Sequence, residues 1–175
     1  PAMRARVGLH DDGSTLFDQD LAQRSREVVT QAEYLTSRYH VVVANPPYMG
    51  SRNMDTLLGD FAAEKFPLSK ADLFAVFIER SLALAIRNGF VSMITMQSWM
   101  FLSTLADLRM NLLAESPVVD MAHLGTGAFD GISGEVVSTT AFVLRVRSKS
   151  TRPIHFTRLV DGVNEAEKSS VLRRV

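Results

Sequence analysis

Residues 39–48 of the chain read YHVVVANPPY, and this stretch decides how the rest of the sequence is interpreted. The run Val41–Val43 is β-branched and unbroken by polar residues, which is typical of a strand covered on both faces in a parallel sheet. Pro46 and Pro47 have no backbone N–H to offer a strand ladder. The sequence therefore predicts a buried strand over residues 39–44 that stops abruptly at a turn.

Helical and extended patterns alternate on both sides of this strand. Apolar spacing predicts helices over residues 14–37, 71–87 and 103–115, and strands over residues 90–95, 118–124, 136–146 and, more briefly, 154–160. The polar and aromatic stretch 49–68 is interpreted as a loop. Alternation of this kind is typical of an α/β sheet with helices on its faces. The last two long strands are expected to form an antiparallel hairpin.

Composition indicates an ordinary globular domain of 175 residues, with 46% apolar and 22% charged residues. The 19 basic and 19 acidic residues give a formal net charge of zero, so net charge offers no argument for a nucleic-acid partner. The absence of cysteine excludes disulfides, thiolate zinc sites and thiol nucleophiles. The histidines lack metal-ligand spacing, so no metal is expected; they are His10, His40, His123 and His155.

Three segments are expected along the chain. Residues 1–13 read as a linker or a truncation scar, residues 14–160 as a partial catalytic domain, and residues 161–175 as a tail with weak helical character. The apolar stretches, such as Val41–Ala44, are much shorter than the roughly 20 residues of a membrane helix. No membrane partner is therefore expected, and the absence of cysteine makes the cytoplasm the expected compartment.

The tetrapeptide Asn45–Tyr48 is the candidate site because ligands of α/β sheets bind at the carboxyl ends of strands. The side-chain oxygen of Asn45 and the carbonyl of Pro46 could together accept the two hydrogens of an exocyclic amine. The ring of Tyr48 offers a flat surface on which the heterocycle bearing that amine could stack. The alternative is a structural one, in which the strand ends in a double-proline turn and Tyr48 packs on the surface.

With this tetrapeptide, the chain resembles the S-adenosylmethionine-dependent adenine-N6 DNA methyltransferases of restriction and phage-defence systems over most of residues 30–147. In that family an Asn-Pro-Pro-Tyr loop follows the fourth strand, and a hairpin of the sixth and seventh strands closes the sheet. The resemblance implies a partial Rossmann-like methyltransferase sheet, strands four to seven, with flanking helices. The stretches ADLF (71–74) and TTAFVL (139–144) resemble most the large methyltransferases of BREX or phage-growth-limitation type.

The resemblance also implies roles for individual residues. Asn45, Pro46 and Tyr48 would be catalytic, and Pro47 and Phe129 would bind the substrate. The target adenine must leave the duplex, at a cost of a few kcal/mol, and would stack between the rings of Tyr48 and Phe129. The implied partners are double-stranded DNA and other subunits of a defence system. Phe129 also has a structural interpretation, as a core residue that anchors a glycine-rich turn.

The cofactor implied by the resemblance is S-adenosylmethionine, but its main binding loop is absent from this chain. Residues 1–40 contain neither the glycine-rich loop nor the acidic residue that the family uses. The stretch Gly125–Gly127 imitates such a loop, and in circularly permuted members the cofactor loop does follow Asn-Pro-Pro-Tyr. Because residues 132–146 read as turn and strand, the imitation is interpreted as a hairpin loop.

Three functions remain open on the sequence alone. The first is the target-binding part of an adenine-N6 DNA methyltransferase, which is inactive as an isolated chain. The second is methyl transfer to a protein glutamine or an RNA base, because an amide or amino nitrogen presents similar hydrogen-bond donors. The third is an inactive domain that serves as a scaffold.

Overall fold

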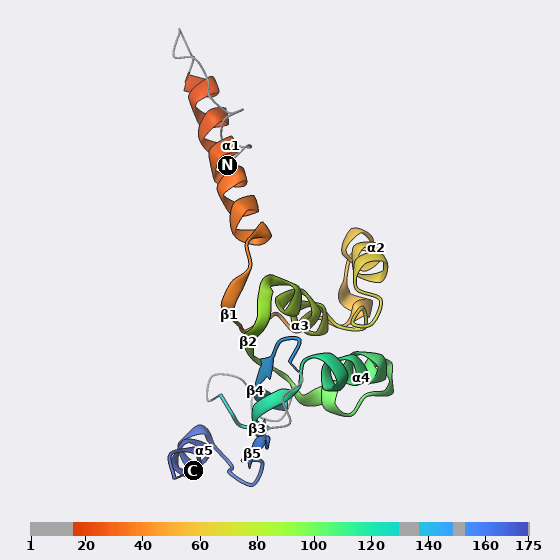
Figure 1. The fold of residues 1–175 in the computed structure, drawn as a ribbon, viewed down its shortest axis with the longest axis vertical. Helices are drawn as coiled ribbons and strands as arrows, with labels where there is room; N and C mark the ends of the chain where they lie inside the picture. The colour runs from red at the N-terminus through yellow and green to blue at the C-terminus, as the bar shows by residue number, and fades with distance from the viewer. Residues whose placement is uncertain (1–15, 130–136, 149–152, 175) are drawn as a thin grey trace. The chain divides into compact units, whose positions relative to one another are not determined.

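The computed structural model describes residues 16–129, 137–148 and 153–174 (Figure 1). The chain divides into two compact units, Pro1–Arg38 and Tyr39–Val175. The first unit contains the helix α1 (Leu16–Thr36), close to the predicted range 14–37. The linker expected over residues 1–13 lies outside the described residues. No helix among the described residues is both long and apolar enough to cross a membrane.

Five strands of the second unit form one mixed sheet in the order β1-β2-β4-β3-β5 (Figure 1). Their bounds are β1 (Tyr39–Ala44), β2 (Ala85–Met96), β3 (Val118–Gly125), β4 (Thr139–Arg145) and β5 (His155–Arg158). β1 runs parallel to β2 and β5 parallel to β3, whereas β4 is antiparallel to both of its neighbours. The α/β class and the antiparallel pairing of β3 with β4 are thus confirmed, and β5 extends the sheet beyond the hairpin.

Two helices cover one face of this sheet, which gives the unit its core. The helices of the unit are α2 (Thr56–Lys65), α3 (Leu73–Leu84), α4 (Ala106–Glu115) and α5 (Glu165–Leu172), with 3₁₀ turns at Ser51–Asn53, Gln97–Met100 and Ser103–Leu105. α3 and α4 contribute Phe74 and Leu108 to the buried cluster that also holds Phe142 of β4. The ring of Trp99 packs against that of Phe142 with centroids 5.0 Å apart.

The loop predicted over residues 49–68 is wrong in part, because it contains α2. The side chain of Asp55 caps this helix by accepting a hydrogen bond from the Leu58 N–H at 2.8 Å. The cap is visible in the sequence as an aspartate before Thr56. The weak apolar periodicity of the segment, with Gly59 inside it, hides the helix that follows.

The predicted boundary between the helix 71–87 and the next strand is also displaced. α3 ends at Leu84, and Ala85 already pairs with Tyr39 of β1. Asn88 adopts a left-handed φ of 63° and donates its backbone N–H to the Val146 carbonyl at 2.7 Å. The pair Asn88-Gly89, which is typical of a helix end, is therefore a bend within β2. Strand pairing before and after this pair outweighs its local preference.

β1 differs from a strand buried on both faces. Val41 and Val43 are 55% and 74% exposed, whereas Val42 and Ala44 pack against the core. Alternate residues of a strand point to opposite faces, and β1 is the end strand of the described sheet. The apolar run therefore has one face against the core and one face open in this structure.

Candidate functional site

The tetrapeptide Asn45–Tyr48 leaves the carboxyl end of β1, as the sequence predicts. Parallel pairing of Ala44 with Met93 aligns this end of β1 with the corresponding end of β2. Pro46 is buried at the turn, Asn45 and Pro47 are exposed, and Tyr48 is half-buried. The strand end thus presents an amide and an aromatic ring on either side of a rigid proline corner.

Two distant parts of the chain line one pocket of about 470 Å³ at this corner. Its lining residues are Asn45, Pro46, Pro47, Tyr48, Phe129 and Val137. All five predicted site residues therefore share one pocket, although the roles assigned to them stay predictions. Val137 was not predicted. In the sequence it lies within the strand predicted over residues 136–146, which gives no hint of a site, whereas β4 begins at Thr139.

Tyr48 is fixed in the pocket wall by the core beneath it. Its ring meets the Phe74 ring edge to face, with centroids 6.2 Å apart and planes at 87°. Phe74 is fully buried in α3, so the contact joins the pocket to the helix that covers the sheet. Burial raises the pKa of the Tyr48 hydroxyl above its ordinary value, because the charged form would lose hydration there.

Asn45 is available for a ligand. Among the described residues, its side chain has no hydrogen-bond partner, and it is exposed at the pocket. Neither Pro46 nor Pro47 has a backbone N–H that could compete for the carbonyl oxygens of this corner. The site is accordingly rich in acceptors and suits a ligand group with two N–H donors.

Asp72 anchors the loop that carries the site, a role that the sequence analysis missed. Its carboxylate accepts hydrogen bonds from the backbone N–H of Met49 at 3.1 Å and of Phe74 at 3.3 Å. Backbone bonds flank this contact, from Leu73 N–H to the Met49 carbonyl at 2.9 Å and from Ser51 N–H to the Ala71 carbonyl at 3.0 Å. One side chain thus caps α3 and holds the loop after β1.

The pKa of Asp72 reflects this position. Partial burial raises its pKa, and the backbone hydrogen bonds from Phe74, Met49 and Leu73 oppose that shift. The sequence signal for the residue is the stretch ADLF before an apolar helix, which indicates a cap and gives no hint of the second partner.

The Gly125–Gly127 turn does not fit a cofactor loop. Both glycines have positive φ, 68° and 66°. A Cβ added at Gly125 would lie 3.0 Å from the Val160 side chain, and one at Gly127 would lie 2.8 Å from the Val163 carbonyl oxygen. The turn therefore packs closely against Val160 and the Val163 backbone, which favours the hairpin interpretation of this turn.

No metal centre is evident in the part of the chain that the structure describes. Within residues 16–129, 137–148 and 153–174, no three His, Asp or Glu side chains gather as metal ligands. His123 contacts a neutral group instead, with its Nε2 2.5 Å from Gln97 Oε1.

Sequence comparison finds relatives of this chain among methylases. The model of the Eco57I restriction-modification methylase family matches residues 9–129. The chain is 47% identical over 147 residues to the adenine-specific methyltransferase BrxX of Escherichia coli O9:H4 (strain HS). It is 44% identical over 143 residues to the adenine-specific methyltransferase PglX of Lacticaseibacillus casei (strain Zhang). These alignments cover 84% and 82% of this chain and 12% of each relative.

Solved structures share the fold at low sequence identity. A class I S-adenosylmethionine-dependent methyltransferase described as putative, from Listeria monocytogenes, matches with a TM-score of 0.58 at 13% identity, over 80% of this chain and 42% of that one. The ATP-dependent Type ISP restriction-modification enzyme LlaBIII, bound to DNA, matches with a TM-score of 0.63 at 16% identity, over 96% of this chain and 13% of that one. The expected methyltransferase-like sheet is thereby confirmed.

Asp72→Ala should loosen the loop and destabilise the chain. Loss of the cap is expected to lower the free energy of unfolding by about 1–2 kcal/mol. Urea unfolding can be followed by the fluorescence of Trp99, the single tryptophan, which is 5% exposed. Hydrogen exchange at the Met49 amide should also become faster.

Asp55→Ala is the matched control, because the Asp55 carboxylate caps α2 by accepting from Leu58 N–H, whereas Met49 N–H donates to Asp72. It should lower stability by a similar amount and leave exchange at Met49 unchanged. Unaltered Met49 exchange in Asp72→Ala would contradict the anchoring role.

Proposed function

The chain belongs to the Eco57I restriction-modification methylase family, and from this membership we propose that it forms the target-binding part of a DNA adenine methyltransferase. Membership confirms the resemblance inferred from the sequence. The identities to BrxX and PglX agree with the narrower resemblance to the BREX and phage-growth-limitation types.

The chain spans 12% of the length of these two relatives, so the proposed activity concerns the complete polypeptide encoded by the gene. DNA is the proposed partner of that polypeptide. The chain is similar in fold to enzymes whose structures contain DNA or a DNA substrate mimic, which supports this choice. Other subunits of a defence system are proposed as further partners.

One observation carries the proposal: Asn45, Pro46, Tyr48 and Phe129 line the same pocket. Asn45 Oδ1 and the Pro46 carbonyl would accept the two hydrogens of the adenine amine. The nitrogen lone pair would then be free to form a bond to the methyl carbon of the donor, whose C–S bond would break as one amine proton leaves to solvent. Holding the amine in one orientation would supply most of the acceleration, since the reaction joins two bound partners.

The aromatic rings of the pocket would hold the base itself. A base within a duplex cannot reach this pocket, so it must rotate out of the helix, at a cost of a few kcal/mol. Stacking on the rings of Tyr48 and Phe129 would offset part of this cost. Tyr48 suits this task because its contact with Phe74 fixes the ring before any base arrives.

S-adenosylmethionine is the proposed methyl donor, in keeping with the class I methyltransferase fold. Bound in the complete polypeptide, it would supply the electrophilic methyl group. The Gly125–Gly127 turn is a poor candidate for its binding loop, because the turn packs closely against Val160 and the Val163 backbone. The chain's own contribution is therefore to hold and orient the acceptor.

Asn45→Ala in the complete polypeptide should reduce methylation of duplex DNA by roughly a hundredfold or more, by analogy with the loss of one transition-state hydrogen bond. Methyl transfer to duplex DNA, RNA and protein substrates should be measured side by side. Asn53→Ala is the control, because Asn53 is exposed and lies outside the pocket lining. Full activity of Asn45→Ala, or transfer to glutamine or RNA with DNA unmodified, would overturn the proposal.

Tyr48→Ala should weaken binding of the target base, since stacking on an aromatic side chain contributes about 1–3 kcal/mol per base. The Michaelis constant for DNA is expected to rise by roughly tenfold or more. Tyr48→Phe preserves the flat ring and should stay close to the wild type. Equal losses in both variants would show that the hydroxyl matters and that stacking does not.

The chain of residues 1–175 should show no tight binding of S-adenosylmethionine in titration calorimetry, because its glycine turn packs closely against Val160 and the Val163 backbone. A dissociation constant near 1 μM, roughly −8 kcal/mol, would contradict this expectation and favour Gly125–Gly127 as a cofactor loop.

A further inference from the structure

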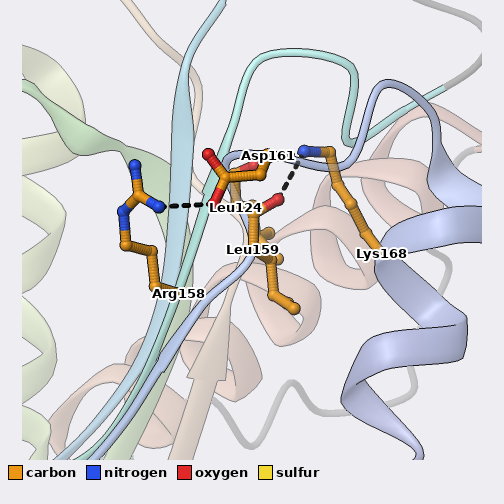
Figure 2. A network of polar contacts seen from close by, with 5 residues as sticks. All are labelled: Leu124, Arg158, Leu159, Asp161 and Lys168. Atoms are coloured by element: carbon orange, nitrogen blue, oxygen red, sulfur yellow. Dashed lines mark hydrogen bonds and ion pairs between the residues drawn. The ribbon is translucent and has the colours of Figure 1, made fainter.

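A buried lysine joins α5 to the sheet. Lys168 is 4% exposed, and its Nζ donates hydrogen bonds of 2.8 Å to the Leu124 carbonyl and 2.8 Å to the Leu159 carbonyl (Figure 2). Lysine is rarely buried to this extent without a partner. Burial lowers the pKa of Lys168, and the charges of Asp161 and Glu167 oppose that shift. With both carbonyls bound and little surface exposed, the ammonium is not available to contact DNA phosphates.

The two carbonyls come from the ends of adjacent strands. Leu124 lies near the end of β3, and Leu159 follows β5 directly. The Leu159 N–H also donates to the His123 carbonyl at 2.9 Å, and an ion pair between Arg158 and Asp161 spans the same turn (Figure 2). Lys168 therefore joins α5 to the carboxyl ends of β3 and β5.

Glycines make the fit between these segments tight. The contacts of Gly125 with Val160 and of Gly127 with the Val163 carbonyl leave no room for a side chain. A Cβ added at Gly162 would lie 2.9 Å from Lys168 Cγ. The turn after β3 is thus packed directly against the residues that lead into α5.

Phe129 follows this turn and lines the pocket with Asn45 and Tyr48. We propose that Lys168 is a positioning residue, which holds the Gly125–Gly127 turn against α5 and thereby keeps Phe129 in the pocket wall. The catalytic consequence of this proposal rests on the proposed function of the pocket. The structural consequence rests only on the contacts of Lys168.

Hydrogen exchange tests the structural part without any methylation assay. Lys168→Met retains the apolar stem of the side chain and removes the ammonium. Exchange in peptides covering residues 123–129 should become at least about tenfold faster, while exchange at Met49 stays unchanged. Lys65→Met is the control, because Lys65 is 56% exposed and pairs with its neighbour Glu64.

Gly162→Ala is the second variant. It tests whether Lys168 positions the Gly125–Gly127 turn if Lys168→Met does not fold. It keeps the ammonium but forces the lysine stem to move, so exchange over residues 123–129 should rise in the same way. Unchanged exchange in the folded variants would overturn the positioning role.

A double-mutant cycle in the complete polypeptide tests the catalytic part. A fluorescent adenine analogue at the target position reports stacking of the base, and methylation kinetics report KM and kcat. Lys168→Met should weaken stacking and raise the KM for DNA several-fold. In a Phe129→Ala background, the same change should have little further effect.

If the losses of activity in Lys168→Met and Phe129→Ala simply multiply in the double variant, Lys168 merely stabilises the fold. That result would overturn the proposal that Lys168 positions Phe129. Faster exchange in Lys168→Met together with unchanged methylation in Asn45→Ala would reject the proposed function. The proposal that Lys168 holds the Gly125–Gly127 turn against α5 would still stand. The failures of the two proposals are therefore distinguishable.

Discussion

The carboxylate of Asp72 is the constraint on which the candidate site depends. Pro46 and Pro47 remove two N–H donors from the loop after β1, so the loop cannot be fixed by a dense network of its own backbone bonds. Asp72 and the backbone beside it hold the far end of the loop through Met49, at the first turn of α3. The corner is therefore held from outside, and among the described residues the Asn45 side chain keeps no hydrogen-bond partner.

The sheet explains why such a corner stands where a ligand can reach it. β1 and β2 run parallel, so both end at the same edge, and α3 connects them across the covered face. Phe74 of that helix supports the ring of Tyr48 from beneath. The same residues that build the core thus set the geometry of the pocket, and loss of packing at Phe74 would be felt at the site.

The opposite wall of the pocket is built by chain distant in sequence. β4 is antiparallel to both β2 and β3, so β3 runs in the same direction as β2 and β1. The turn after β3 therefore lies at the edge of the sheet where Asn45 lies. Gly125 and Gly127 allow close approach of the segment leading into α5, and Lys168 ties that segment to two carbonyls. What imitates a cofactor loop in the sequence is therefore an internal packing contact in the structure.

The sequence by itself determined the features that are covalent or local: the double-proline corner after a β-branched strand, and the order of helices and strands apart from α2. It placed Asn45–Tyr48 at a strand end, and family resemblance rather than local pattern suggested Phe129. Tertiary structure decided the rest. Asn88 lies within β2, Asp72 binds the loop as well as its helix, and Lys168 is buried, because each depends on partners far along the chain. Local propensity cannot encode such partners, since their energies exist only once the sheet has formed.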